Sequence, residues 1–163
     1  MSNVIFFDID DTIINGQSQP RLVKYLFFKG KINILFLIRV YFWFILYKLS
    51  LIKSPLSIME YSFRFISGWR IDLTEKILNE FYNDNLKVKL NRKVIDEINY
   101  HKKQGNIIII VTNVFYSLAK IIADNLGIDK VIATNLEIEN NRYTGKIKGE
   151  IVYGENKVRQ SKK

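Results

Sequence analysis

The sequence predicts an α/β fold, in which a parallel sheet with helices on both faces is interrupted by a helical insert. Short apolar runs at residues 3–8, 106–111 and 130–133 have the length and character of buried parallel strands. Segments with helical periodicity follow and precede the second strand. This alternation of strands and helices implies right-handed crossovers and hence a parallel sheet.

The helices around the second strand have recognisable ends. Residues 91–104 carry an apolar stripe, and Gly105 is placed to stop that helix. The next helix is expected over 115–126 and is closed by Gly127. Each glycine therefore marks the end of a helix that is followed by a predicted strand.

The predicted core is completed by a hairpin over residues 137–148 that turns at Asn140–Asn141. The core then consists of residues 1–15 and 91–163. The insert, residues 16–90, lies between the first two strands and reads as wholly helical.

Within the insert, two helix starts are predicted. Asp72 and Glu75 have the spacing of a capping box with Asp72 as the cap, which opens a helix running to about residue 83. Pro55 is placed to start another helix that ends near Gly68.

The most unusual segment is the apolar stretch 32–52, whose length suits a membrane span. Arg39 near its middle would be costly inside a bilayer, and Lys48 interrupts it again. If the first two strands share a sheet, a single crossing is excluded, because both flanking segments must lie on one side. Three arrangements remain: a buried helix of a soluble insert, an in-plane interfacial helix, or a re-entrant hairpin turning at 29–31.

Composition narrows the class of protein. Apolar residues make up 48% and charged residues 25% of the chain, which is typical of a globular protein. The absence of cysteine excludes disulfides and Cys-based zinc sites. The first residues lack the features of a signal peptide, so a cytoplasmic location is expected, with a peripheral place on the inner face of the membrane as the alternative.

The net charge of +9 has two interpretations. The lysines and arginines are scattered, as a general compositional bias would leave them. The alternative is attraction to an anionic surface, most plausibly phospholipid. Nucleic acid is not an expected partner, because no DNA- or RNA-binding motif is present.

The candidate chemistry lies in Asp8-Ile9-Asp10-Asp11-Thr12, directly after the first strand. Two carboxylates two residues apart on such a loop can converge on a hard cation such as Mg²⁺. Backbone N–H groups in the loop, including that of Ile9, can bind phosphate oxygens. A solvated acidic turn is the alternative interpretation of the same residues.

The order of motifs resembles that of the haloacid dehalogenase superfamily. DxDx(T/V) follows the first strand, Thr112 ends the second strand, and Lys157 matches the later lysine. Residues 126–149 follow the course of the phosphoserine-phosphatase-like subfamily (IB), which also places a helical (C1-type) cap directly after the first motif.

The resemblance implies a magnesium-dependent phosphatase that works through an aspartyl-phosphate. Asp8 is then the nucleophile, and Asp10 the general acid and base. Thr112 and the N–H of Asn113 hold the phosphoryl group, and Lys157 offsets its charge. The Asp8 carboxylate and the Asp10 carbonyl are the implied ligands of Mg²⁺.

The sequence departs from this family in its last motif, an acidic loop after a fourth strand. The six residues after Lys157 are too few for it, so the sequence predicts a truncated chain whose last core strands are missing. Low or no turnover is expected of it alone, and a second chain that supplies the rest is the alternative. The first strand would then be an open edge, available for pairing.

The substrate class is narrowed by differences from phosphoserine phosphatases. Gln17 stands where those enzymes have a glutamate, and Asn113-Val114 stands where they have two glycines. The aromatic, apolar insert looks more like the phosphatidylglycerophosphate phosphatase branch, which implies a phosphate on a lipid headgroup. A soluble phosphorylated small molecule and a non-catalytic membrane- or partner-binding remnant are the alternatives.

Overall fold

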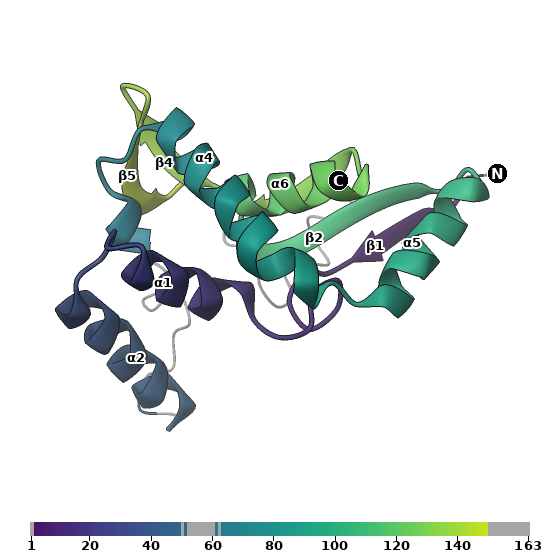
Figure 1. Ribbon diagram of the computed structural model, residues 1–163. Coiled ribbons are helices and arrows are strands. Elements are labelled where there is room, and N and C mark those ends of the chain that lie inside the picture. The colour runs from purple at the N-terminus through teal and green to yellow at the C-terminus, as the bar shows by residue number, and fades with distance from the viewer. Residues whose placement is uncertain (1, 50, 52–60, 62, 150–163) are drawn as a thin grey trace.

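The computed structural model describes residues 2–49, 51, 61 and 63–149. It contains a parallel sheet of three strands in the order β1-β2-β3, formed by β1 (Val4–Phe7), β2 (Ile107–Phe115) and β3 (Lys130–Thr134). α5 (Arg92–Lys103) precedes β2, and α6 (Tyr116–Leu126) connects β2 to β3. The predicted α/β class with a parallel sheet is therefore confirmed (Figure 1).

The two helices that flank β2 end as their glycines predict. Gly105 and Gly127 both have a positive φ, of 71° and 62°. After α5, the N–H of Asn106 donates to the carbonyl of His101, and after α6 the N–H of Ile128 donates to that of Ala123. A second bond at each end, from the N–H of Gly105 to the Lys102 carbonyl and from that of Gly127 to the Asp124 carbonyl, completes a Schellman motif.

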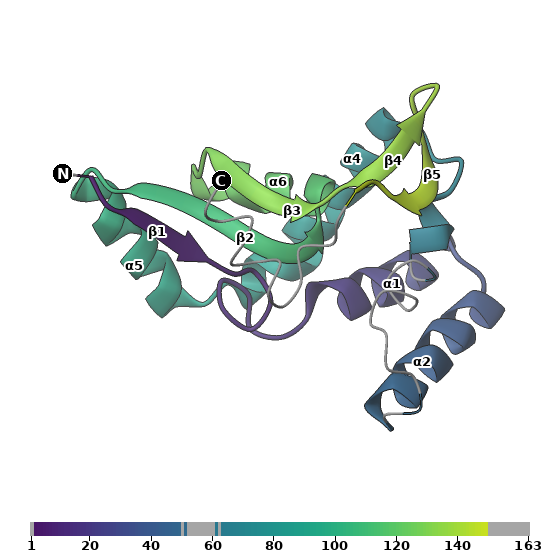
Figure 2. The same cartoon turned by 180° about the vertical axis from the view of Figure 1, so that it is seen from behind.

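The first strand is more exposed than predicted. Val4 and Phe6 are 45% and 43% exposed, although the sequence indicated a buried strand. Val4 is in register with Ile107, which is also exposed, so these side chains share one face of the sheet. Figure 2 looks onto the strands with α5 and α6 behind them, and among the described residues β1 pairs only with β2.

The second strand runs further than predicted. The sequence predicts a strand over residues 106–111 that ends at Thr112, but β2 continues through Thr112 and Asn113 to Phe115. Its register with β3 shifts between Val111 and Phe115, so the extra residues form an irregularity beside the edge of the sheet.

The predicted hairpin is confirmed. β4 (Leu136–Glu139) pairs antiparallel with β5 (Arg142–Ile147), and the turn residues Asn140 and Asn141 have φ of 49° and 61°. Left-handed backbone at both turn positions suits asparagine and matches the twist of a two-residue hairpin.

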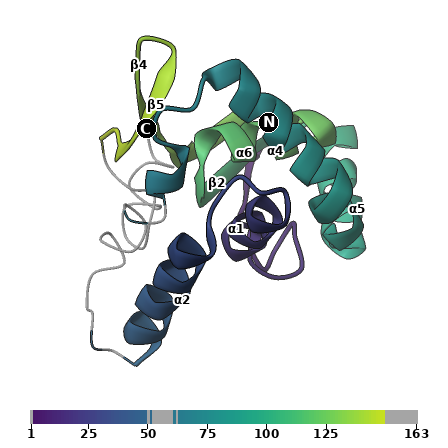
Figure 3. The same ribbon diagram turned by 60° about the vertical axis from the view of Figure 1, so that its left-hand side comes forward.

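The described part of the insert is helical. It comprises α1 (Ser18–Phe28), α2 (Ile34–Lys48), the short η1 (Arg64–Ile66), α4 (Ile71–Phe81), a π-helical turn η2 (Tyr82–Leu86) and η3 (Lys87–Lys89). In Figure 3, α2 extends away from the rest of the molecule. Within the described residues, no helix combines the length and the apolar character that crossing a bilayer requires.

The two helix starts predicted within the insert have different outcomes. Asp72 does not cap α4: it lies in the first turn and accepts hydrogen bonds from the guanidinium of Arg70 at 2.8 and 3.0 Å. In a capping box this carboxylate would accept a hydrogen bond from a backbone N–H. Here Arg70 binds it instead. The helix start predicted at Pro55 lies outside the described residues.

The hairpin holds the insert against the core. The N–H of Gly68 donates to the carbonyl of Tyr143 at 2.8 Å, and the N–H of Tyr143 donates to the carbonyl of Trp69 at 3.0 Å. The Arg142 guanidinium adds a bond of 2.7 Å to the Gly68 carbonyl. The segment that leads into α4 is thus fixed to β5 by backbone hydrogen bonds.

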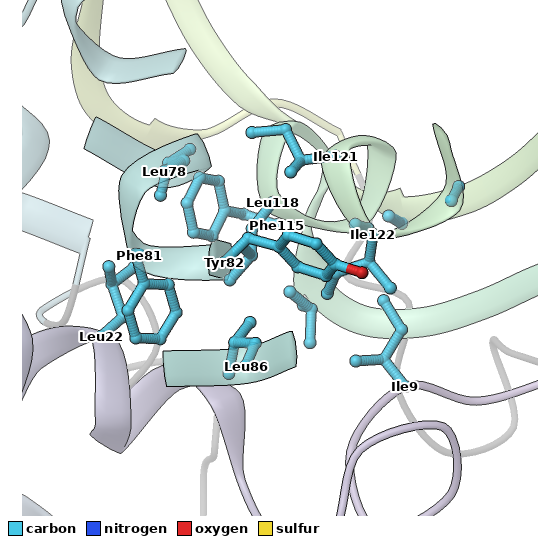
Figure 4. Packing of buried hydrophobic residues seen from close by; sticks show 14 of the residues in the cluster. Ile9, Leu22, Leu78, Phe81, Tyr82, Leu86, Phe115, Leu118, Ile121 and Ile122 are labelled. Carbon is cyan, nitrogen blue, oxygen red and sulfur yellow. The ribbon is translucent and has the colours of Figure 1, made fainter. Parts of the chain in front are cut away.

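One hydrophobic cluster joins the insert to the sheet (Figure 4). The insert contributes side chains from α1, α4 and η2, and they meet side chains of the loop after β1, of β2 and of α6. The labelled members are Ile9, Leu22, Leu78, Phe81, Tyr82, Leu86, Phe115, Leu118, Ile121 and Ile122.

Candidate active site

Asp8 lies directly after β1, at the start of the loop that leads to α1. Its Oδ1 accepts a hydrogen bond of 2.8 Å from the N–H of Ile9. That N–H was predicted to bind a phosphate oxygen, and in this structure it holds the Asp8 carboxylate. The loop's own backbone therefore orients the carboxylate at the carboxyl edge of the sheet.

The loop after Asp8 is tightly wound and anchored in the core. Ile9, Ile13 and Ile14 are fully buried. The N–H of Ile14 donates to the carbonyl of Ile9 at 2.9 Å, and that of Ile13 donates to the carbonyl of Asp8 at 3.3 Å. Asp11 adopts a left-handed backbone with φ of 57°. Burial of these isoleucines fixes the loop against the core.

Asp10 points at the start of α1. Its Oδ1 accepts a hydrogen bond of 2.9 Å from the backbone N–H of Ser18, the first residue of that helix. Helix N-termini favour negative charge at this position. The Ser18 hydroxyl is close enough to favour the carboxylate form, yet its Oγ is buried and has no hydrogen-bond partner among the described residues.

Burial raises the pKa of Asp10 above that of an ordinary aspartate. The nearby Ser18 hydroxyl and the hydrogen bond from the Ser18 N–H lower this pKa, and the negative charges of Asp8 and Asp11 raise it further. Removal of the carboxylate from water is the largest of these effects, and it disfavours the charged form. A carboxyl group of this kind is suited to hold a proton and release it to a substrate.

The same charges make the loop a candidate for a divalent cation. Asp8 and Asp11 are close enough to Asp10 to repel its negative charge. A hard cation with oxygen ligands relieves such repulsion, and Mg²⁺ keeps several water or substrate oxygens in its shell. In the described part of the chain no three His, Cys, Asp or Glu side chains form a metal-binding group. Asp8 and Asp10 carry the oxygen donors that such a cation would use.

The sequence did not predict a contact between Gln17 and Asp11. The Gln17 side-chain amide donates to the Asp11 carboxylate, and both side chains are exposed. The sequence indicates Gln17 only as the residue that stands in place of a substrate-binding glutamate. The left-handed turn at Asp11 brings these side chains together, and no periodic pattern in the sequence signals it.

Thr112 lies in the strand next to Asp8. Phe7 is in register with Ile110, so Asp8 and Thr112 both come shortly after a paired position, at the same edge of the sheet. Thr112 is fully buried, and its Oγ1 accepts a hydrogen bond of 3.3 Å from the N–H of Val114. The expectation that Thr112 ends its strand is wrong, because β2 continues past it.

Of the two other residues predicted to bind phosphate, the structure describes Asn113 but not Lys157. Asn113 follows Thr112 in the irregular part of β2 and is half-buried. Lys157 lies outside the described residues. A further polar residue at this edge was missed: Thr134, the last residue of β3, is fully buried with its hydroxyl unpartnered among the described residues.

Comparisons with known proteins agree with this arrangement. The family model described as haloacid dehalogenase-like hydrolase matches residues 5–163. A probable phosphatase of Mycobacterium tuberculosis is 27% identical over 155 residues, which cover 94% of this chain and 54% of that protein. A phosphoserine phosphatase of Archaeoglobus fulgidus is 28% identical over 101 residues, 62% of this chain and 27% of that protein. The chain thus spans about half or less of the curated relatives it matches.

Solved structures show the same fold. A protein of unknown function from Bordetella pertussis superposes with a TM-score of 0.90 at 21% identity, over 99% of this chain and 73% of that one. A phospho-aspartyl intermediate analogue of phosphoserine phosphatase superposes with a TM-score of 0.61 at 17% identity, over 91% of this chain and 64% of that one.

Proposed function

The chain belongs to the haloacid dehalogenase-like hydrolase family, and on that premise we propose that it hydrolyses phosphate monoesters with the Asp8–Thr12 loop. The observation that carries the proposal is the pair of carboxylates at the end of β1. One of them is oriented by a backbone N–H, and the other is half-buried against the start of α1. Phosphatases among the relatives support the reaction class.

In the proposed reaction, an oxygen of the Asp8 carboxylate attacks phosphorus and displaces the alcohol of the substrate. Asp10, whose pKa burial raises, gives its proton to the departing oxygen. Water then attacks the phosphorus of the aspartyl-phosphate, and Asp10 takes up the proton that this water loses. Inorganic phosphate leaves, and both carboxyl groups return to their starting state.

Other groups would hold the transferred phosphoryl group. The N–H groups of Ile9 and Asn113 and the hydroxyl of Thr112 are the proposed donors, together with the ammonium of Lys157. For Ile9, the phosphate would share the N–H that now binds Asp8. Mg²⁺, held by the Asp8 carboxylate and the Asp10 carbonyl, would shield the nucleophile from the negative charge of the phosphate.

The proposed substrate is a phosphate monoester on a lipid headgroup, such as phosphatidylglycerophosphate. Support comes from the insert, because α1 follows the loop directly and leads through a short turn to α2, whose side chains are apolar on nearly every side. A lipid that remains in its bilayer would then reach the loop from the side of the insert.

Phosphate release tests the proposal, with p-nitrophenyl phosphate as a soluble substrate and phosphatidylglycerophosphate in vesicles as the lipid substrate. We expect Mg²⁺-dependent release that Asp8→Asn abolishes. Asp11→Asn is the matched control, because it removes a carboxylate from the same loop and asparagine tolerates the left-handed backbone. An equal loss of phosphate release in Asp8→Asn and Asp11→Asn would refute the role of Asp8 as the nucleophile. Equal turnover of both substrates without lipid would favour a soluble small-molecule phosphatase.

A further inference from the structure

One face of α2 carries apolar side chains that project into solvent. Its members, which we call the α2 stripe, are between 42% and 63% exposed: Ile34, Leu35, Ile38, Tyr41, Phe42 and Ile45. At the rotation of an α-helix these positions fall within an arc of roughly 120°. A contiguous apolar face of this kind is a candidate binding surface. The arrangement in which α2 is a buried helix is therefore wrong for this face.

The opposite side of α2 is already in contact with the protein. Phe36 stacks on Tyr61 and meets Phe65 edge to face, with ring centroids 5.8 and 6.2 Å apart. Trp43 also stacks on Tyr61, at 5.9 Å. These contacts fix the rotation of α2 about its axis. The stripe is thus held outward by the packing of the other face.

The charge of the chain is concentrated in the same region. Residues 16–70 contain nine lysines and arginines and one acid, Glu60, a net +8 of the chain's +9. The rest of the chain carries sixteen basic and fifteen acidic residues. The lysines and arginines themselves remain scattered along the chain, and the local excess arises because residues 16–70 contain a single acidic residue.

Exposed cations lie next to the stripe. Arg39 is exposed and falls beside the edge of the arc, where its long side chain can reach headgroups while its stem covers apolar surface. Lys31 is exposed at the turn before α2, in which Gly30 has a φ of 65°. Lys29, at the same turn, is half exposed and lies 3.7 Å from Asp84.

We propose that the α2 stripe docks in the plane of an anionic phospholipid bilayer, with the exposed cations Lys31 and Arg39 contacting the headgroups. An apolar face combined with basic flanks is what an interfacial helix presents to such a surface. A second copy of the chain fits less well, because pairing two stripes would bring two segments of net +8 together. The proposal holds whether or not the chain hydrolyses phosphate.

The topology favours this orientation over a single crossing of the membrane. β1 and β2 are adjacent in one sheet, so the chain leaves that sheet and returns to it on the same side of the bilayer. The 15 residues of α2 span about 22 Å, less than the roughly 30 Å of a hydrocarbon core. An in-plane helix satisfies both conditions.

Vesicle cosedimentation tests the proposal. The chain is mixed with vesicles of phosphatidylcholine alone or of phosphatidylcholine with phosphatidylglycerol, neither of which carries a phosphomonoester. We expect binding to the anionic vesicles at least about tenfold tighter than to the neutral ones, and weaker binding as salt is raised. This assay measures binding and not turnover. Absence of vesicle binding would therefore not argue against the proposed phosphatase activity, and absence of phosphatase activity would not argue against membrane binding.

Matched variants locate the binding face. Phe42→Glu places a charge in the stripe and should weaken binding about tenfold or more. Val88→Glu makes the same change of charge at a side chain 76% exposed in η3, and should bind like the unchanged chain apart from a small charge effect. Because the chain has no cysteine, a polarity-sensitive fluorophore on Ile38→Cys should shift to the blue on anionic vesicles, and one on Val88→Cys should not.

Several results would overturn the proposal. These are no binding to anionic vesicles, equal binding by both glutamate variants, or fluorophore shifts of equal size at the two positions. A stable dimer in sedimentation that Phe42→Glu dissociates would assign the stripe to a second copy instead. Circular dichroism of each variant confirms that the helices are intact.

Discussion

Replacing Gly145 with alanine tests how tightly the hairpin holds the insert. Gly145 lies in β5 with a φ of 82°, a conformation that L-residues rarely adopt. An added Cβ would lie 3.1 Å from the Cβ of Ser67, 3.3 Å from the carbonyl oxygen of Phe63 and 3.4 Å from the Cα of Arg64. Two of these three neighbours are backbone atoms, so the segment before α4 would have to move.

Two effects add up in Gly145→Ala. The left-handed backbone costs an alanine about 1–2 kcal/mol, and overpacking against closely fitted atoms costs about 1–3 kcal/mol more. Gly149 is a matched control, because its φ is 78° and an added Cβ would meet no atom of the described residues within 4 Å. Gly149→Ala should therefore show the backbone cost alone.

Urea denaturation followed by circular dichroism measures both variants. We expect Gly145→Ala to lower the free energy of unfolding by about 1–3 kcal/mol more than Gly149→Ala does. At roughly 2–4 °C per kcal/mol for a chain of this size, thermal melts should separate in the same order. Equal destabilisation by the two variants would show that the contact between β5 and residues 63–67 is not tight.

Buried polar groups give two further predictions. Thr134→Val removes a buried hydroxyl that has no partner among the described residues, and should leave the free energy of unfolding unchanged or raise it by about 1 kcal/mol. Thr74→Val should lower it by about 1 kcal/mol, because that equally buried hydroxyl donates to a backbone carbonyl at 2.8 Å; equal effects in urea denaturation would contradict the assigned bonds. Burial raises the pKa of Asp10 in the folded chain, so the stability linked to this group is fully present below its unfolded pKa and is lost as pH rises through the folded pKa. Asp10→Asn should therefore be more stable than the unchanged chain at neutral pH without divalent cations, and the advantage should shrink in acid; melting temperatures that differ by the same amount at every pH would rule this out.

Elements governed by local chemistry could be predicted from the sequence. The glycines after α5 and α6 supply left-handed backbone where each helix ends, and Asn140–Asn141 supplies it for the hairpin. Apolar runs identified the three strands, because strands of parallel sheets are usually apolar throughout, although β1 is more exposed than its run predicts. The acidic loop could be placed after β1 because it follows such a run directly.

Features that depend on tertiary partners could not be predicted. Asp72 has the spacing of a cap, but Arg70 binds its carboxylate. β2 continues past Thr112 because β3 pairs with it again at Phe115 after the shift in register. Hydrophobicity alone could not decide whether α2 is buried, since it is apolar on nearly all sides. Its aromatic contacts with residues 61 and 65 determine which face remains exposed.

The central claim is that Asp8 carries the phosphoryl group. Its most direct test is acid quenching of the chain during turnover with Mg²⁺ and a phosphomonoester, followed by mass spectrometry of its peptides. We predict one added phosphoryl group, located on Asp8, and none in Asp8→Asn under the same conditions. Phosphate release with no modified Asp8 peptide, or a phosphoryl group on Asp10 or Asp11 instead, would contradict the account.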